Sequence, residues 1–263
     1  NRDEALKWAR KGLAAYPDDP ELLAVAARLL FSVPGSLRED LRAAARDEGR
    51  ELARKAYATP PPAPAAAAAS LDAALAAAAG AEAARLLLVD AAARYDWTAA
   101  AAYLARAAAA PGFEDRALAA LVLRKGGDWA AALAQAEAWY RERPESEAAA
   151  EAYARALVGV KSDKAAQELL ARLLAAKGSP AFRSSLHYLQ SLLQKSDEAA
   201  LPPLRSALVE NADNGEALAA MCDIYYRRKD YQKARFYLKQ ALSLAPGDPE
   251  LARRQRELDA AAP

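Results

Sequence analysis

A unit of 34 residues recurs through the C-terminal two-thirds of the chain, and this repeat constrains the fold more than any other feature. The segments 113–146 and 215–248 start 102 positions apart, which is three times 34. The two blocks between them, 147–180 and 181–214, keep the same frame. A period of this length is typical of stacked supersecondary units, so we expect a repeat array rather than a single globular core.

Each unit has the pattern of two helices separated by a turn. In the last unit, Leu218, Met221 and Tyr225 follow the i, i+3, i+4 spacing of one helix face. Lys229-Asp230 interrupts this period, which resumes from Tyr231. An acidic residue precedes an aromatic one at the same kind of turn in three places, Asp96-Trp97, Asp128-Trp129 and Asp230-Tyr231. One such hairpin cannot cover its own apolar face, so neighbouring hairpins are expected to stack.

These units resemble the tetratricopeptide repeat (TPR), whose 34-residue unit consists of two antiparallel helices. The last unit carries the signature positions of that family at Leu218, Met221, Cys222, Tyr225, Ala234, Leu238, Ala241 and Pro246. The resemblance covers about residues 81–248 well and residues 1–57 more loosely. It implies an all-α fold, a right-handed α-solenoid of TPR-type helical hairpins that ends in a capping helix.

Composition shifts along the chain divide it into four expected parts. Residues 1–58 are predicted to form TPR-like helices that begin mid-repeat, because 3–16 resembles the second helix of a hairpin. Residues 59–80 are a Pro/Ala-rich break followed by an Ala-rich segment at 65–79, which is expected to form a packed helix, with a flexible linker as the alternative. Residues 81–248 form the TPR array, with its first helices at 81–94 and 97–110. Residues 249–263 form a capping helix and tail.

Local signals predict three helix starts. Ser36 and Glu39 have the spacing of a capping box, which predicts a long helix from Leu37. Pro202-Pro203 lies where a second helix should already be running, so we expect that helix to start near Pro202 or to kink there. Asp248, followed by Pro249, is expected to cap a last helix that continues to about residue 259.

The composition offers no chemistry for catalysis. One Cys and one His exclude an intramolecular disulfide framework, a Cys-cluster metal site and a multi-histidine site. His187 and Cys222 are interpreted as packed structural residues, and no glycine-rich phosphate loop is present. We therefore expect no enzyme activity, no cofactor and no metal. The 36 basic and 35 acidic residues give a formal charge of +1, which predicts no global attraction to nucleic acid, and no transmembrane segment is expected.

The resemblance implies an inner groove lined by the first helix of each hairpin. In the 34-residue frame, the groove positions are Leu86, Val89, Leu118, Leu121, Arg124, Arg155, Phe182, Leu186, Leu189, Asp223 and Tyr226. This wall is mostly apolar. The Lys and Asn set with which chaperone-binding TPR proteins clamp a C-terminal carboxylate is not present, so that function is not carried over.

An apolar groove on a protein surface needs a cover. We expect it to receive a peptide or an amphipathic helix from another protein, which predicts a non-catalytic scaffold for protein–protein interaction. The chain's own segments 65–79 or 249–259, or a second copy of the chain, are alternative occupants. Alternative functions are an envelope-anchored TPR lipoprotein accessory to transport or envelope assembly, and a regulatory TPR module of a larger protein. The abundance of Ala and Arg favours a bacterial source. Two compartments stay open, the cytoplasm and the periplasm, the latter reached through a lost N-terminal signal or anchor.

Overall fold

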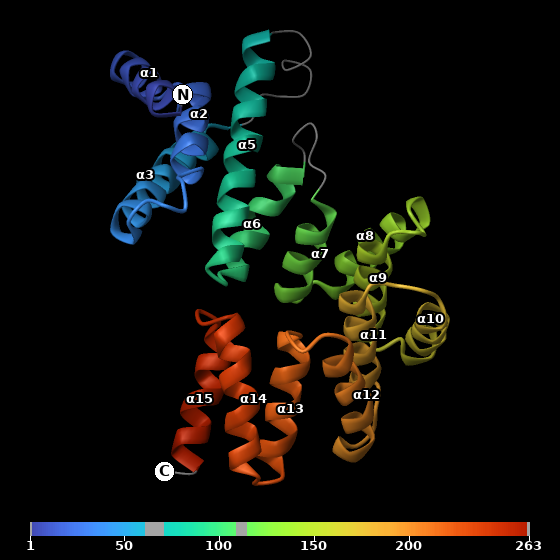
Figure 1. Cartoon of the computed structure of the whole chain (residues 1–263). Helices are drawn as coiled ribbons and strands as arrows, with labels where there is room; N and C mark the ends of the chain where they lie inside the picture. The colour runs from blue at the N-terminus through green and yellow to red at the C-terminus, as the bar shows by residue number, and fades with distance from the viewer. Residues whose placement is uncertain (1, 61–70, 109–114, 262–263) are drawn as a thin grey trace. The chain divides into compact units, whose positions relative to one another are not determined.

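The structure, a computed structural model, describes residues 2–60, 71–108 and 115–261, with side chains from residue 74 onward in the second of these ranges. All regular secondary structure in these ranges is helical (Figure 1). The chain divides into two compact units, Asn1–Asp115 and Arg116–Pro263, which are described separately. No helix in the described ranges has both the length and the apolar character needed to cross a membrane.

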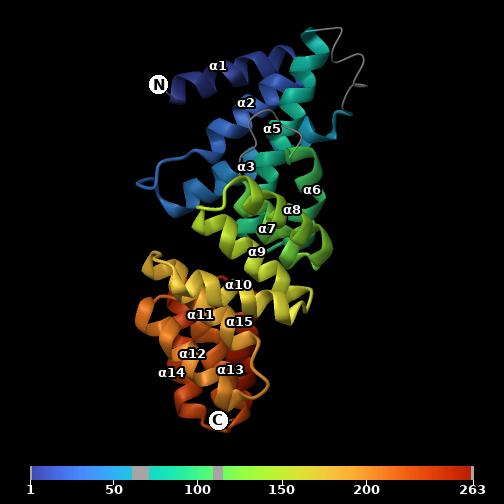
Figure 2. The same cartoon turned by 90° about the vertical axis from the view of Figure 1, so that its right-hand side faces the viewer.

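In unit 1, the described residues form helices over five segments of the chain. They are α1 (Arg2–Ala15), α2 (Pro20–Phe31), α3 (Glu39–Ala58), α5 (Leu71–Ala93) and α6 (Trp97–Ala108). Helix α5 packs against α6 on one side and against α2 and α3 on another (Figures 1 and 2). The core joins Leu23 and Leu87 to alanines such as Ala27, Ala53 and Ala83, which are fully buried. Because these alanines have small side chains, the helix backbones can approach closely.

The predicted capping box at Ser36 is wrong. Helix α3 begins at Glu39, its N-cap is Arg38, and no side chain caps it. The turn before the helix is closed by its own backbone, since the Leu37 N–H donates to the Pro34 carbonyl at 3.1 Å. Ser36 therefore lies within this turn and is too far from the first helical N–H groups to cap them.

Helix α5 also differs from expectation. Separate helices were predicted at 65–79 and 81–94, but one helix runs from Leu71 through Gly80 to Ala93, and residues 61–70 lie outside the described residues. A Cβ atom at residue 80 would overlap the guanidinium of Arg106, so glycine makes room for it. That guanidinium donates to the carbonyls of Tyr57 and Thr59 at the end of α3. The glycine is thus explained by packing and not by a helix end.

Unit 2 is built of helical hairpins in series. Its helices are α7 (Arg116–Lys125), α8 (Trp129–Glu142), α9 (Glu147–Gly159), α10 (Asp163–Ala175), α11 (Pro180–Leu192), α12 (Asp197–Glu210), α13 (Gly215–Arg227), α14 (Tyr231–Leu244) and α15 (Pro249–Ala261). Seven starts are fixed by a side-chain oxygen that accepts the N–H three residues later, at Asp128, Ser146, Ser179, Ser196, Asn214, Asp230 and Asp248.

Two alternatives were predicted for α12, a start near Pro202 or a kink there, and the first is wrong because the helix begins five residues earlier, at Asp197. Ser196 caps it through the Ala199 N–H at 3.2 Å, so Pro202 and Pro203 lie inside the helix. Two backbone N–H donors are lost at the prolines, which is unfavourable. The helix forms because Leu201, Leu204 and Ala207 are buried along its inner side. Tertiary packing therefore overrides the local proline signal.

The last helix, α15, forms where the sequence predicts it. The Asp248 carboxylate accepts the Glu250 N–H at 2.8 Å and so caps the helix start. Leu251 and Leu258 are buried against α13 and α14, while much of the remaining surface of α15 is charged. The predicted all-α fold of TPR-type hairpins, ending in a capping helix, is confirmed.

Candidate functional site

The residues predicted to line the groove fall into two groups. Phe182, Leu186 and Leu189 are buried, with exposed fractions of 7%, 0% and 2%. The others are exposed or half-buried, namely Leu86 and Val89 in unit 1, and Leu118, Leu121, Arg124, Arg155, Asp223 and Tyr226 in unit 2. The three buried side chains belong to a core cluster that includes Leu170, so they cannot serve as accessible groove anchors.

A shift of one residue in the repeat explains this error. Helix α9 begins at Glu147, α11 at Pro180 and α13 at Gly215, so the intervals are 33 and 35 positions instead of 34 and 34. One residue rotates a helix face by about 100°. In the corrected frame the residue of α11 that corresponds to Arg155 and Asp223 is Tyr188. The pair Ser179-Pro180, a cap followed by proline at the first helical position, is the sequence signal that could have located this start.

A pocket of about 230 Å³ lies between the first helices of two successive hairpins, α7 and α9. Small side chains form much of it, at Ala117, Ala120, Ala132, Ala148, Ala152 and Ala156. Leu121 adds an apolar wall, and Arg124, Glu151 and Arg155 add charges. The structure thus brings three predicted groove residues, Leu121, Arg124 and Arg155, into one pocket.

Four charged side chains form a network beside this pocket. Glu216 of α13 pairs with Arg155 of α9 at 2.5 Å and with Arg124 of α7 at 3.6 Å, and Arg155 also pairs with Glu151 at 2.8 Å. The Arg155 guanidinium lies 5.7 Å from the centre of the Tyr188 ring, within cation–π distance. The two basic and two acidic groups cancel, so this part of the inner face carries no net charge.

Burial and pairing have opposite effects on these groups. Burial lowers the pKa of Arg124, and the nearby charge of Arg155 adds to this shift. Burial also acts against the charge of Arg155, but Glu216 and Glu151 outweigh it and raise the pKa of Arg155. For Glu216 burial acts to raise the pKa, and the two arginines reverse this and lower it. Arg124, Arg155 and Glu216 are therefore ionised near neutral pH.

The inner face of unit 2 is more polar than the sequence predicted. Asp223 of α13 forms a two-pronged pair with Arg254 of α15 at 2.7 and 2.8 Å. Burial, together with the charge of Glu216, raises the pKa of Tyr188 to about 12, so its hydroxyl is neutral near pH 7. Tyr188 and Arg254 were missed as members of this face. The expected apolar wall is therefore a surface of paired charges, and the pocket between α7 and α9 combines alanines and Leu121 with three of these charged side chains.

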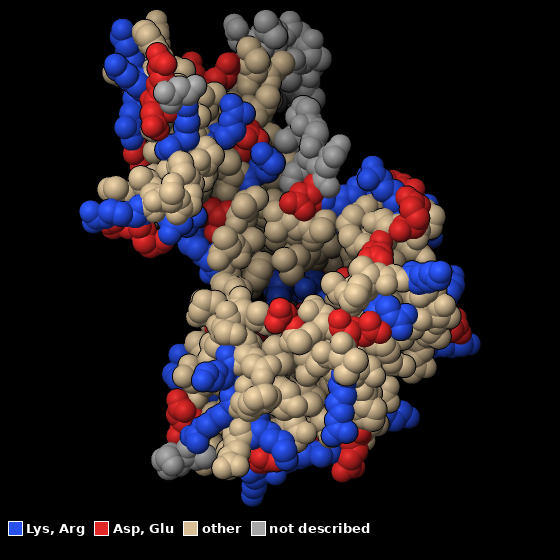
Figure 3. Space-filling view, viewed as in Figure 1, with Lys and Arg blue, Asp and Glu red and all other residues tan. Residues whose placement is uncertain are grey.

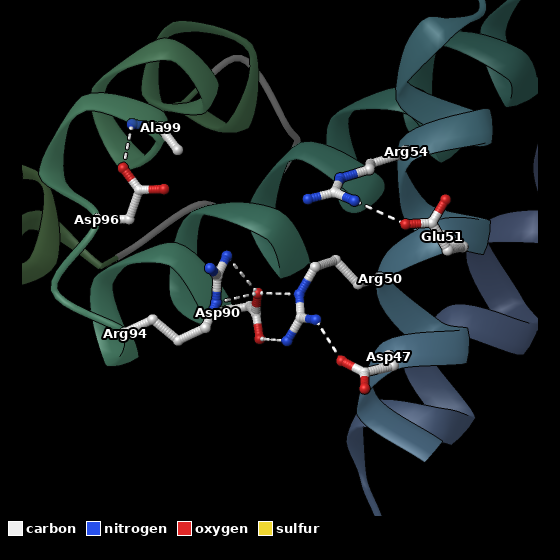
Figure 4. A network of polar contacts seen from close by, with 8 residues as sticks. All are labelled: Asp47, Arg50, Glu51, Arg54, Asp90, Arg94, Asp96 and Ala99. Carbon is white, nitrogen blue, oxygen red and sulfur yellow. Dashed lines mark hydrogen bonds and ion pairs between the residues drawn. The ribbon is translucent and has the colours of Figure 1, made fainter. Parts of the chain in front are cut away.

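Unit 1 has a pocket of its own, between α3 and α5, with a volume of about 600 Å³. Leu86 and Val89, two predicted groove residues, line it together with Phe31. Arg50 pairs with Asp90 at 2.7 Å in its wall (Figure 4). Burial acts to raise the pKa of Asp90, but Arg50 and Arg94 outweigh it and lower the value. This pocket combines apolar side chains with arginines.

His187 and Cys222 differ in their burial. Cys222 is buried, and burial raises the pKa of its thiol to about 11, which keeps it protonated. His187 is half-buried and its Nδ1 lies 3.5 Å from the Gln190 side-chain oxygen. Within the part of the chain that the structure describes, no three His, Cys, Asp or Glu side chains are grouped to hold a metal ion.

Surface charge is mixed and not segregated. On the face shown in Figure 3, basic and acidic side chains are interspersed over both units. Residues 227–229 are three consecutive basic residues, and two of them have acidic partners on α12. Arg227 pairs with Asp197 at 2.5 Å and Arg228 with Glu198 at 3.4 Å. The run is thus largely neutralised by α12, in agreement with the balanced formal charge.

Comparison with known proteins supports the fold. Residues 215–248, the hairpin of α13 and α14, match the family model described as tetratricopeptide repeat. This match identifies a tetratricopeptide repeat at 215–248, within a series of helical hairpins. No curated protein matches it significantly.

Among solved structures, the chain is similar to one described as the crystal structure of the APC/C hetero-tetramer Cut9-Hcn1. The identity is 13% and the TM-score 0.47, over 100% of this chain and 46% of the other. The chain therefore spans less than half the length of that protein.

Proposed function

We propose that unit 2 binds a segment of a partner protein, a peptide or an amphipathic helix, at the pocket between α7 and α9. The tetratricopeptide repeat at 215–248 supports a role in protein interaction. In that family the first helix of each hairpin lines the binding face, and α7 and α9, which form the pocket, are first helices of their hairpins. The observation that carries the proposal is the combination of small alanine side chains with Leu121 and a charged end in one concavity.

The chemistry of the pocket indicates how a partner would bind. The alanines leave space for a large apolar side chain of the partner, which gains free energy when it leaves water. Leu121 contributes the largest apolar contact in the pocket. Arg124, Glu151 and Arg155 retain hydrogen-bonding capacity at its end, so they can orient polar groups of the bound segment. An affinity of about 1 μM, or about −8 kcal/mol, suits one such anchor.

The proposal predicts that filling the pocket abolishes binding. Ala148 is exposed and lines the pocket, so Ala148→Trp adds a large side chain there without disturbing a buried core position. Ala171, on α10, is also exposed and lies outside the pocket lining, so Ala171→Trp is the matched control. A photo-crosslinking amino acid at position 152 of each variant reports the bound protein after irradiation in native lysate.

We expect a discrete crosslinked partner with the parent protein and with Ala171→Trp. The yield should fall at least tenfold with Ala148→Trp while helicity and Tm stay unchanged. Equal yields from both tryptophan variants would contradict the proposed pocket. A crosslink only to a second copy of the chain would contradict binding of a partner protein and would indicate self-association at this pocket.

A further inference from the structure

We propose that the pocket between α3 and α5 of unit 1 binds a small amphiphilic anion, a carboxylate or phosphate monoester joined to an apolar chain or ring. Its volume of about 600 Å³ falls within the range of small-molecule sites. The lining consists of Phe31, Ala43, Arg46, Asp47, Arg50, Arg85, Leu86, Val89, Asp90, Ala93 and Arg94. The site belongs to a different unit from the proposed protein-binding pocket, and the two proposals stand independently.

The charge of the pocket favours an anion. Four arginines and two aspartates line it, which gives a formal charge of +2 for the lining residues. Arg46 is exposed and makes no hydrogen bond or ion pair with the residues that the structure describes. Arg85 is half covered and pairs with Glu82, outside the lining, at 3.1 Å. Arg46 therefore offers a complete guanidinium to a ligand, and such groups bind carboxylate and phosphate through paired hydrogen bonds.

The aspartates of the pocket are already engaged by arginines. Asp90 accepts hydrogen bonds from Arg50 at 2.7 and 3.0 Å and from Arg94 at 3.1 Å, and Asp47 accepts one from Arg50 at 2.5 Å (Figure 4). Both carboxylates are thus neutralised by direct partners, which reduces their repulsion of an incoming anion. The same bonds fix Arg50 in place, and an arginine that is held in position loses less side-chain entropy when a ligand binds.

The remaining lining explains why the anion should carry an apolar group. Phe31, Leu86 and Val89 contribute large apolar side chains to the same pocket, and Val89 is 49% exposed. An inorganic anion would leave these side chains in contact with water. A purely apolar ligand would bury the Arg46 guanidinium without a partner, which is costly. A ligand with both parts satisfies both kinds of wall.

The test uses the full chain and a fluorescent amphiphilic anion, 8-anilinonaphthalene-1-sulfonate. We expect saturable fluorescence that octanoate or octyl phosphate displaces and that octyltrimethylammonium and inorganic phosphate do not. Displacement by octanoate alone identifies a carboxylate ligand, and displacement by octyl phosphate alone identifies a phosphate monoester. Failure of both anionic amphiphiles to compete, or equal competition by the cationic one, would overturn the proposal.

Two variants in the lining and one control outside it locate the binding to the pocket. Arg46→Gln should weaken the competing anion roughly tenfold, the effect expected for loss of a charge-assisted pair. Arg54→Gln makes the same charge change on the same helix, outside the lining, and should change affinity less than twofold. Val89→Gln should weaken octanoate and octyl phosphate by removing part of the apolar wall. Equal losses in Arg46→Gln and Arg54→Gln would show nonspecific charge attraction instead.

Discussion

At the scale of single residues, a leucine on one helix contributes to the core or to the surface according to whether it lies on the buried or the exposed face of that helix. Leu189 and Leu192 lie three positions apart on α11, yet Leu189 is 2% exposed and Leu192 is 48% exposed. Leu189 packs in the cluster that contains Leu170 and Leu186. Its burial therefore contributes to stability and leaves no surface for a ligand.

Replacing Leu189 by Ala should destabilise the protein strongly. The substitution removes buried methyl and methylene groups and leaves a cavity, so we expect a loss of about 2–5 kcal/mol in the free energy of unfolding. Leu192→Ala, on the same helix but exposed, should change it by less than about 1 kcal/mol. Urea denaturation followed by circular dichroism measures both. Similar small losses for the two variants would mean that Leu189 is not a core residue.

At the scale of helices, periodicity predicted most elements, but local signals failed where packing overrides them. The i, i+3, i+4 pattern correctly located α13 and α14 because each buries one apolar face against its neighbours. The start of α12 was missed because three buried residues outweigh two prolines. For the candidate site, the fixed frame of 34 identified Leu121, Arg124 and Arg155, and it failed on α11, where the interval from α9 is 33.

Helix α12 should become more stable when Pro202 is replaced by Ala. The new N–H can donate to the carbonyl four residues earlier, and the clash of the proline ring with the preceding turn is removed. The less restricted unfolded chain offsets part of this gain. We expect a net increase of about 1–2 kcal/mol in the free energy of unfolding, measured by urea denaturation. Val209→Ala, at an exposed site of the same helix, is the control, with a change of less than about 0.5 kcal/mol. A loss of stability in Pro202→Ala would indicate that the helix depends on the geometry imposed by proline.

At the scale of the whole molecule, both units place a carboxylate between two arginines. Asp90 has Arg50 and Arg94 in unit 1, and Glu216 has Arg155 and Arg124 in unit 2. In both cases the pairing outweighs burial and lowers the pKa of the acid below its ordinary value. The stability of each unit is therefore coupled to the ionisation of one acid.

This arrangement predicts that both units lose stability in acid. Because the pKa values of Asp90 and Glu216 are lower in the folded state, their contribution is complete above the unfolded values of 3.8 and 4.5. It disappears as the pH falls through the lower folded values, where the unfolded chain binds more protons than the folded one. Thermal unfolding at pH 7, 5, 4 and 3 should show Tm falling mainly below about pH 4.5.

The variant Glu216→Gln separates this effect from general acid denaturation. At pH 7 it should cost about 1–3 kcal/mol, because two half-buried arginines lose an ionic partner. Below pH 4 the difference from the parent protein should shrink, since protonated Glu216 already resembles glutamine. Glu198→Gln, which removes an exposed and weakly paired acid at 3.4 Å from Arg228, should change Tm little at any pH. A constant difference between Glu216→Gln and the parent from pH 7 to pH 3 would mean that the Glu216 network does not depend on its charge.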